Sequence, residues 1–137
     1  MNDFLDSLKN ELPDGFTCVT DKQTDWLKTR YNGFRFEYKD WSDFDFKIEF
    51  EGINLSGLII GIVRKSTCTK DIRSIDEANI VANCLNLNNP NDNWYWDYPT
   101  EPKYSNWFNV ESIQMLLDGS MKDWIIGKLT SAIKKSK

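Results

Sequence analysis

The residues of this chain whose types and spacing could support catalysis are a Pro13-Asp14 pair and a later Glu37-Tyr38-Lys39. Two carboxylates of this kind can hold Mg²⁺, and the lysine can position water or stabilise negative charge on a phosphate. Glu37 and Lys39 are two residues apart, so they share one face of a strand. Asp14, Glu37 and Lys39 are therefore the candidate catalytic residues, and their chemistry would be metal-assisted cleavage of a phosphodiester.

A structural role accounts for the same residues with fewer assumptions. Acidic residues and lysines are common in this chain, so a Glu-x-Lys sequence is expected by chance. Pro13-Asp14-Gly15 is typical of a turn rather than of a strand. Glu37 and Lys39 also find charge partners across a predicted hairpin. We therefore expect no catalytic residue, no cofactor and no metal, and we do not expect an enzyme.

Composition excludes several other functions. The chain has no histidine, which rules out Ser-His and Cys-His catalysis and imidazole-based zinc sites. The three cysteines are odd in number and far apart, so they predict neither a disulfide framework nor a CxxC metal site. The net charge of -4 argues against broad binding to nucleic acids or anionic membranes. No apolar run approaches the ~18 residues of a membrane span, and the first residues do not resemble a signal peptide. We expect a cytoplasmic protein without membrane contact.

Alternating apolar and charged residues predict three successive antiparallel strands between residues 34 and 63. We pair Phe36 with Ile48, because this register places opposite charges across the hairpin at three positions, whereas a slip of two residues opposes like charges. The three expected pairs are Arg35 with Glu49, Glu37 with Lys47, and Lys39 with Asp45.

The third of these strands, residues 55 to 63, is apolar on both faces and should be central in the sheet. We expect a short strand at residues 16 to 20 as its second neighbour. Gly57 and Gly61 should leave room for a ring or a helix above the strand.

Helical spacing predicts helices at residues 2–12, 74–85, 109–119 and 120–133, with Asn2, Ser74, Asn109 and Ser120 as N-caps. Residues 21–31 could be helical or extended. Residues 86–93 are expected to be a loop, and residues 94–107 an irregular aromatic stretch. Residues 1–137 should form a single α+β domain, with a three- or four-stranded antiparallel meander sheet and helices packed on one face.

The loops contain the candidate binding residues. Trp and Tyr anchor protein interfaces, although the rings between Trp94 and Trp107 could instead form a lid over the sheet. We favour core packing for Trp94, Trp96 and Trp107. Loop carboxylates could recognise a basic partner or simply be solvated. The candidate partner-binding residues are Trp41, Asp43, Tyr95, Asp97, Tyr98, Glu101 and Tyr104.

The succession FDFKIEFEGINLSGLIIGIV, NWYWDYP and MKDWIIGKLTSAI resembles the C-terminal portion of a PD-(D/E)XK nuclease-like family of bacterial and phage proteins, over about residues 34 to 133. In that family an aromatic antiparallel hairpin precedes a Trp-rich loop and closing helices. The nuclease core of such proteins lies upstream, so no catalytic residue carries over. The resemblance implies a detached accessory module that recognises a partner or substrate.

Together these observations favour a non-enzymatic protein-binding module of the bacterial or phage cytoplasm. An immunity protein or anti-defence inhibitor that occludes a protein partner is the typical case, and nucleic acid is not the expected partner. The alternative is an accessory recognition domain of a nucleic-acid-processing system. A divergent Mg-dependent nuclease is the least favoured alternative. The negative net charge supports the first function, and a basic stripe on the folded surface would support the second.

Overall fold

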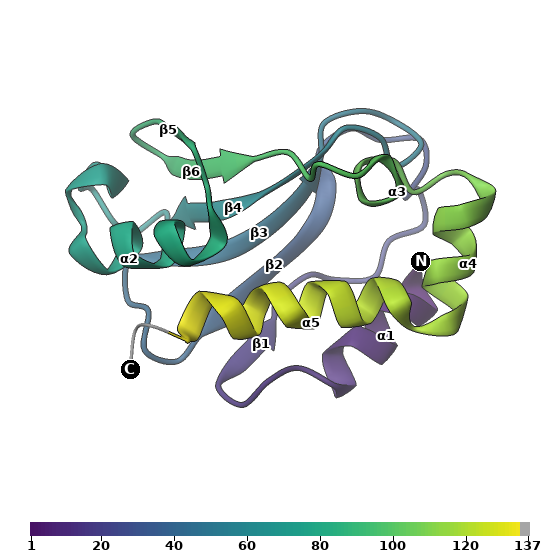
Figure 1. Cartoon of the computed structure of the whole chain (residues 1–137), viewed down its shortest axis with the longest axis horizontal. Coiled ribbons are helices and arrows are strands. Elements are labelled where there is room, and N and C mark those ends of the chain that lie inside the picture. The colour runs from purple at the N-terminus through teal and green to yellow at the C-terminus, as the bar shows by residue number, and fades with distance from the viewer. Residues whose placement is uncertain (135–137) are drawn as a thin grey trace.

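A six-stranded antiparallel sheet with strand order β1-β2-β3-β4-β6-β5 forms the centre of the protein (Figure 1). The computed structural model describes residues 1–134. Its strands are β1 (Phe16–Cys18), β2 (Asn32–Tyr38), β3 (Phe44–Phe50), β4 (Leu58–Arg64), β5 (Asn89–Pro90) and β6 (Trp94–Asp97). Its helices are α1 (Asn2–Asn10), α2 (Asp76–Leu85), α3 (Pro102–Ser105), α4 (Val110–Asp118) and α5 (Ser120–Ile133), with a 3₁₀ turn η1 (Ile72–Ser74).

The predicted α+β class and the antiparallel sheet are confirmed, but the predicted strand number is wrong. The additional strands β5 and β6 lie in segments that we expected to be a loop and an irregular stretch. They are only two and four residues long, too short to show a periodic pattern. Residues 21–31, which were ambiguous, contain neither a helix nor a strand.

The strands β2, β3 and β4 form the predicted meander in a different register. Phe34 lies opposite Ile48, and Phe36 lies opposite Phe46. The predicted pairing of Phe36 with Ile48 is therefore wrong by two residues. Both registers place the same apolar side chains on the same face, because side chains in a strand alternate with a period of two.

The charged residues on the other face satisfy one another without facing directly across the hairpin. Arg35 Nε lies 2.8 Å from Asp45 Oδ2, two positions along the neighbouring strand. Lys47 Nζ lies 2.8 Å from Glu49 Oε1 on its own strand. Lys65 Nζ approaches Asp45 Oδ1 at 3.5 Å from beyond the end of β4. Long side chains reach diagonal partners, so matching the charge signs of facing residues did not determine the register.

The second neighbour of β4 is β6, not the segment around β1. β1 pairs with β2 on the opposite side of the sheet. Gly61 lies opposite Trp96, and a Cβ atom added to Gly61 would lie 2.1 Å from the carbonyl oxygen of Tyr95. The missing side chain therefore allows close approach of a strand backbone rather than of a ring or a helix. Gly57 instead adopts a φ of +66° in the turn before β4.

The predicted helices are present, but only one predicted N-cap functions as a cap. Asn109 caps α4, because its side chain accepts a hydrogen bond of 2.9 Å from the backbone N–H of Ser112. Ser74 does not cap α2, because its hydroxyl donates to the carbonyl oxygen of Asp71 at 2.6 Å.

The remaining two predicted caps, Ser120 and Asn2, also have other roles. At the start of α5 the side chain of Asp118 accepts a hydrogen bond of 2.8 Å from the backbone N–H of Ser120. Met1, not Asn2, is the N-cap residue of α1, and it makes no side-chain capping bond.

The hydrophobic core lies between one face of the sheet and the helices α1, α2 and α5. Phenylalanine and isoleucine side chains of β2, β3 and β4 are buried in one cluster with apolar residues of these three helices. Burying each large side chain contributes about 1.5–3 kcal/mol, so this face supplies much of the stability. Within residues 1–134, no helix combines the length and apolar character needed to cross a membrane.

Candidate functional site

The structure does not gather the three candidate catalytic residues into a cluster of metal ligands. Asp14 lies exposed in the turn before β1. Glu37 points to a different partner, with its carboxylate 3.8 Å from Lys65 Nζ. Lys39 follows β2, and its backbone N–H donates to the carbonyl oxygen of Gly15. Among residues 1–134, no three His, Cys, Asp or Glu side chains are arranged to hold a metal ion.

Trp41 belongs to the core and not to an exposed binding surface. Its side chain is 2% exposed. The rings of Phe16, Tyr38 and Phe44 surround it, with centroids between 4.9 and 5.6 Å away. A ring buried in this way cannot contact a partner, so the predicted surface has to be corrected at this position.

The predicted tyrosines are partly occupied by contacts within the chain. The ring of Tyr104 stacks on Trp124, with centroids 4.4 Å apart. Tyr98 is 49% exposed, and its hydroxyl donates to Glu51 Oε1 at 2.9 Å. This hydrogen bond to Glu51 raises the pKa of the Tyr98 phenol.

The predicted acidic residues are dispersed. Asp97 accepts a hydrogen bond of 3.1 Å from the side chain of Asn88. Glu101 forms an ion pair of 3.3 Å with Lys103. Asp43 lies in the loop between β2 and β3. Asp97 is the last residue of β6, and Glu101 precedes α3, so the three carboxylates come from different parts of the fold.

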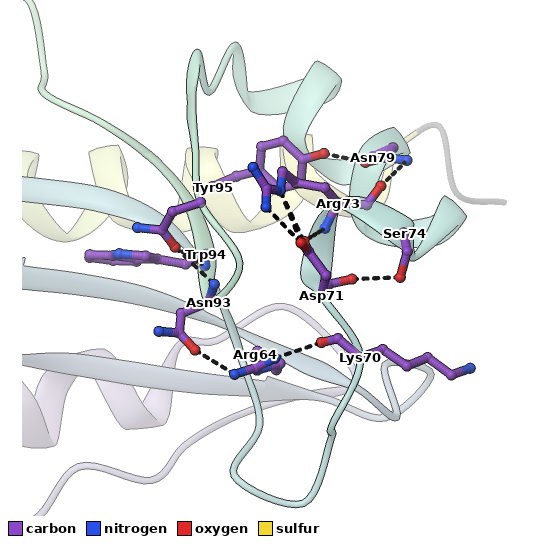
Figure 2. A network of polar contacts seen from close by, with 10 residues as sticks. Arg64, Lys70, Asp71, Arg73, Ser74, Asn79, Asn93, Trp94 and Tyr95 are labelled. Carbon is purple, nitrogen blue, oxygen red and sulfur yellow. Dashed lines mark hydrogen bonds and ion pairs between the residues drawn. The ribbon is translucent and has the colours of Figure 1, made fainter.

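A polar network joins the loop before η1 to β6 (Figure 2). Asp71 and Arg73 form a two-pronged ion pair with a shortest distance of 2.6 Å. The hydrogen bonds from Arg73 lower the pKa of Asp71 to about 2. Arg64 donates to the carbonyl oxygen of Lys70 at 2.8 Å and to Asn93 Oδ1 at 2.6 Å.

Tyr95 completes this network, because its hydroxyl donates a short hydrogen bond to the side-chain oxygen of Asn79 (Figure 2). Burial is the main cause that raises the pKa of the Tyr95 phenol. The network therefore joins β6 to α2 through hydrogen bonds within the chain.

The tryptophans of β6 lie on the sheet face opposite the core. Trp94 pairs with Val63 and Trp96 with Gly61, and both rings are half-buried. Their centroids are 6.5 Å apart, and Lys47 Nζ lies 6.0 Å above the ring of Trp94. The prediction that these two rings pack in the core is wrong, because they alternate with Tyr95 onto the other face.

Trp107 is the aromatic residue of this segment that the core does contain. Its side chain is fully buried, and its indole N–H donates to the carbonyl oxygen of Tyr104 at 2.9 Å. Its ring meets Phe4 of α1 and Phe50 of β3 edge to face, at centroid distances of 5.7 and 4.9 Å.

The strongest candidate site is a groove of 830 Å³ between α1, residues 24–28 and α4. Four apolar residues that are themselves buried form its floor: Phe4, Trp26, Leu55 and Trp107. Ile113, Leu116 and Leu117 of α4 form one wall. Apolar concavities of this size are typical of small-molecule and cofactor sites in proteins.

Helix α4 is apolar on two faces. Met115 and Leu116 pack against the core. Val110, Ile113 and Leu117 point outward, with exposed fractions of 76%, 41% and 83%. Their spacing of three and four residues places these three side chains in one stripe. Together with Phe108, which is also exposed, they form what we call the α4 patch: Phe108, Val110, Ile113 and Leu117.

The charged side chains that line the groove are three acidic and two basic. Asp3, Asp25 and Asp118 lie there with two lysines, Lys28 and Lys122. Lys122 is already neutralised, because its Nζ lies 2.9 Å from Glu11 Oε2.

The side chain of Asp118 is held ionised. It accepts hydrogen bonds from the hydroxyl and the backbone N–H of Ser120, and these lower its pKa.

Asn2 holds the third wall of the groove in place. Its side-chain oxygen accepts hydrogen bonds from the indole N–H of Trp26 at 2.7 Å and from the backbone N–H of Gln23 at 3.0 Å. Its amide nitrogen donates to the carbonyl oxygen of Gln23 at 2.7 Å. Asn32 adds a hydrogen bond of 2.9 Å to the carbonyl oxygen of Trp26.

The sequence alone does not reveal this groove. Its walls come from three segments that are far apart in the chain, so no local motif marks it. One signal was present in the sequence: Val110, Ile113 and Leu117 form an apolar stripe in addition to the one that α4 needs for its core contacts. In comparisons with known proteins the chain matches no family model, and no curated protein or solved structure is significantly similar to it.

Proposed function

We propose that this protein is a non-enzymatic protein-binding module that covers a surface of its partner with the groove and the α4 patch. One observation carries the proposal: Val110 and Leu117 expose most of their apolar side chains beside an apolar groove. Exposed apolar groups that gather at one place mark sites of protein interaction. A small acidic immunity or anti-defence inhibitor of a bacterial or phage cytoplasm is the class that fits this surface.

Helix α4 exposes apolar side chains that a partner could bury. Fully burying a leucine or valine side chain contributes roughly 1.5–3 kcal/mol. Val110 and Leu117 leave most of this contribution unused in the isolated chain, because they face outward. A partner that covers the stripe would gain it.

The test is a comparison of two charge-introducing variants, Leu117→Glu and Ile80→Glu. Ile80 is also an exposed apolar residue, but it lies on α2, outside the groove. Tagged wild type and variants are used to capture proteins from a nuclease-treated lysate of the source cells. We expect wild type and Ile80→Glu to capture one stoichiometric partner. Leu117→Glu should capture at least tenfold less of this partner. Equal capture by both variants would reject the groove and patch as the binding surface.

A second function, recognition of a single-stranded nucleic acid as an accessory domain, is favoured by the two tryptophans on the open face of the sheet. Trp94 and Trp96 could stack on bases, and Lys47 lies beside them. Glu49 on the same face neutralises Lys47, which weakens this function. Capture that disappears on nuclease treatment and persists in Leu117→Glu would support it instead.

A further inference from the structure

We infer that the groove takes one amphipathic helix of the partner protein, with apolar side chains on the inserted face and lysine or arginine along its flanks. The inference rests on the proposed function and names the segment that the proposed surface would bind. It follows from the shape of the groove, from the reach of the α4 patch and from the charges of the lining.

The walls of the groove favour a helix over an extended peptide. α1 and α4 form two sides, and Figure 1 shows the beginning of α1 beside α4. The backbone N–H and C=O groups inside these helices bond within the helices, so they cannot form a ladder with an added strand. A helix needs only side-chain contacts, and its ridges can pack into the space between two other helices.

The α4 patch favours a macromolecule over a small ligand. Val110 lies on the exposed stripe but outside the lining of the groove. A ligand confined to the groove would leave Val110 in water. A helix of several turns can fill the groove and cover the stripe with anchors spaced three, four and seven residues apart.

The charged side chains of the groove favour basic residues on the flanks of the partner's helix. Asp3, Asp25 and Asp118 lie along the groove, and Glu11 neutralises one of the two lysines of the lining. Complementary potentials speed association and exclude incorrect partners. A helix with basic flanks satisfies these carboxylates, whereas one with acidic flanks faces them unpaired.

The same charges argue against a second copy of this chain as the occupant. In a two-fold symmetric contact the same patch of both copies is buried, so the acidic side chains of both grooves would be enclosed in one interface. Like charges facing each other oppose such an interface.

Synthetic peptides of about 20 residues, long enough to form helices, serve as the probes. All carry the same leucines at helical spacing and no tryptophan. One has lysine flanks, one has glutamate flanks, one has lysine flanks and two central prolines, and one is a scrambled version of the lysine peptide. Binding is measured by calorimetry and by the fluorescence of the protein, because Trp26 and Trp107 line the groove.

We expect the lysine peptide to bind at least tenfold more tightly than the other three peptides. Leu117→Glu should remove this binding, and Ile80→Glu should preserve it. The double variant Asp3→Asn, Asp25→Asn should bring the lysine and glutamate peptides to similar affinity. Asp118 is left intact because it accepts a hydrogen bond from the backbone N–H of Ser120 at the start of α5.

Three results would overturn the inference: equal binding of the lysine and glutamate peptides, equal binding of the proline peptide, or no binding of any peptide. Sedimentation that shows a wild-type dimer dissolved by Leu117→Glu would also overturn it, in favour of a second copy. The proposed function fails separately, when capture from lysate does not depend on Leu117.

Discussion

The side-chain oxygen of Asn2 accepts the indole N–H of Trp26 at 2.7 Å and thereby ties the first residue of α1 to the irregular segment that forms one wall of the groove. The same side chain forms two further hydrogen bonds, one with the backbone N–H of Gln23 and one with its carbonyl oxygen. A segment without helix or strand is held here by side-chain hydrogen bonds of Asn2, and Asn32 adds another to Trp26. The groove therefore depends on a polar contact at its edge as well as on its apolar floor.

Replacing Asn2 by Ala should destabilise the protein by about 1–3 kcal/mol, because partly buried groups of Trp26 and Gln23 lose their hydrogen-bond partners. Urea unfolding followed by circular dichroism measures this loss. Asn2→Asp keeps the acceptor oxygen but loses the amide donor, so its stability should lie between those of Asn2→Ala and wild type. A neutral Asn2→Ala would show that the segment is held by packing alone.

Gly61 and Gly127 should respond to alanine in opposite ways. A Cβ at Gly61 would lie 2.1 Å from the backbone oxygen of Tyr95, whereas a Cβ at Gly127 meets nothing within 4 Å. Gly61→Ala should cost about 1–3 kcal/mol by forcing β6 away from β4. Gly127→Ala in α5 should stabilise the protein by roughly 0.5–1 kcal/mol, because alanine is the better helix former. Thermal unfolding of both variants tests the pair, and a tolerated Gly61→Ala would contradict the close approach of β6.

A double-mutant cycle should show that Arg35 and Asp45, which form an ion pair, contribute to stability in a coupled way. The side chain of Asp45 is 4% exposed, and that of Arg35 is 34% exposed. Arg35→Met leaves the buried carboxylate with Lys65 at 3.5 Å. Arg35→Met should lower the free energy of unfolding by up to about 3 kcal/mol. This is the low end of the range for buried ion pairs, because Arg35 is partly solvated.

In the same cycle Asp45→Asn removes the charge that Arg35 balances. The double variant should therefore lose less free energy of unfolding than the two single variants lose together. Strict additivity, measured by urea unfolding, would mean that this contact does not determine the diagonal pairing of β2 and β3.

Stability should fall at acidic pH partly because of Asp71. Its pKa in the folded protein is about 2, below the ordinary value of 3.8, because Arg73 donates hydrogen bonds to the carboxylate. The unfolded chain therefore binds a proton first as the pH falls. The contribution of Asp71 is complete above about pH 4 and is lost as the pH falls toward 2.

Asp71→Asn should flatten the pH dependence of unfolding within this window. Arg73→Gln should move the titration midpoint of Asp71, followed by carboxyl NMR, up toward 3.8. An unchanged midpoint in Arg73→Gln would show that the ion pair with Arg73 is not the cause of the lowered pKa of Asp71.

Much of the local structure follows directly from the residues. Alternating phenylalanines predict β2 and β3, and apolar residues at helical spacing predict α1 and α5, because such patterns follow from the geometry of one element and its single buried face. The absence of histidine excludes whole classes of catalysis before any fold is known. Apart from the buried Trp41, the partner-binding role stays a prediction for the other residues proposed for it: Asp43, Tyr95, Asp97, Tyr98, Glu101 and Tyr104.

Long-range contacts determine the rest. The register of β2 and β3 accompanies a diagonal ion pair, and β5 and β6 are too short to be recognised without their partner β4. Trp41 is buried because rings from β1 and β2 meet it. The groove exists because α1, residues 24–28 and α4 converge, and convergence of distant segments leaves no local pattern in a sequence. The exposed stripe on α4 is visible in the sequence, but its meaning depends on which face of the helix the core covers.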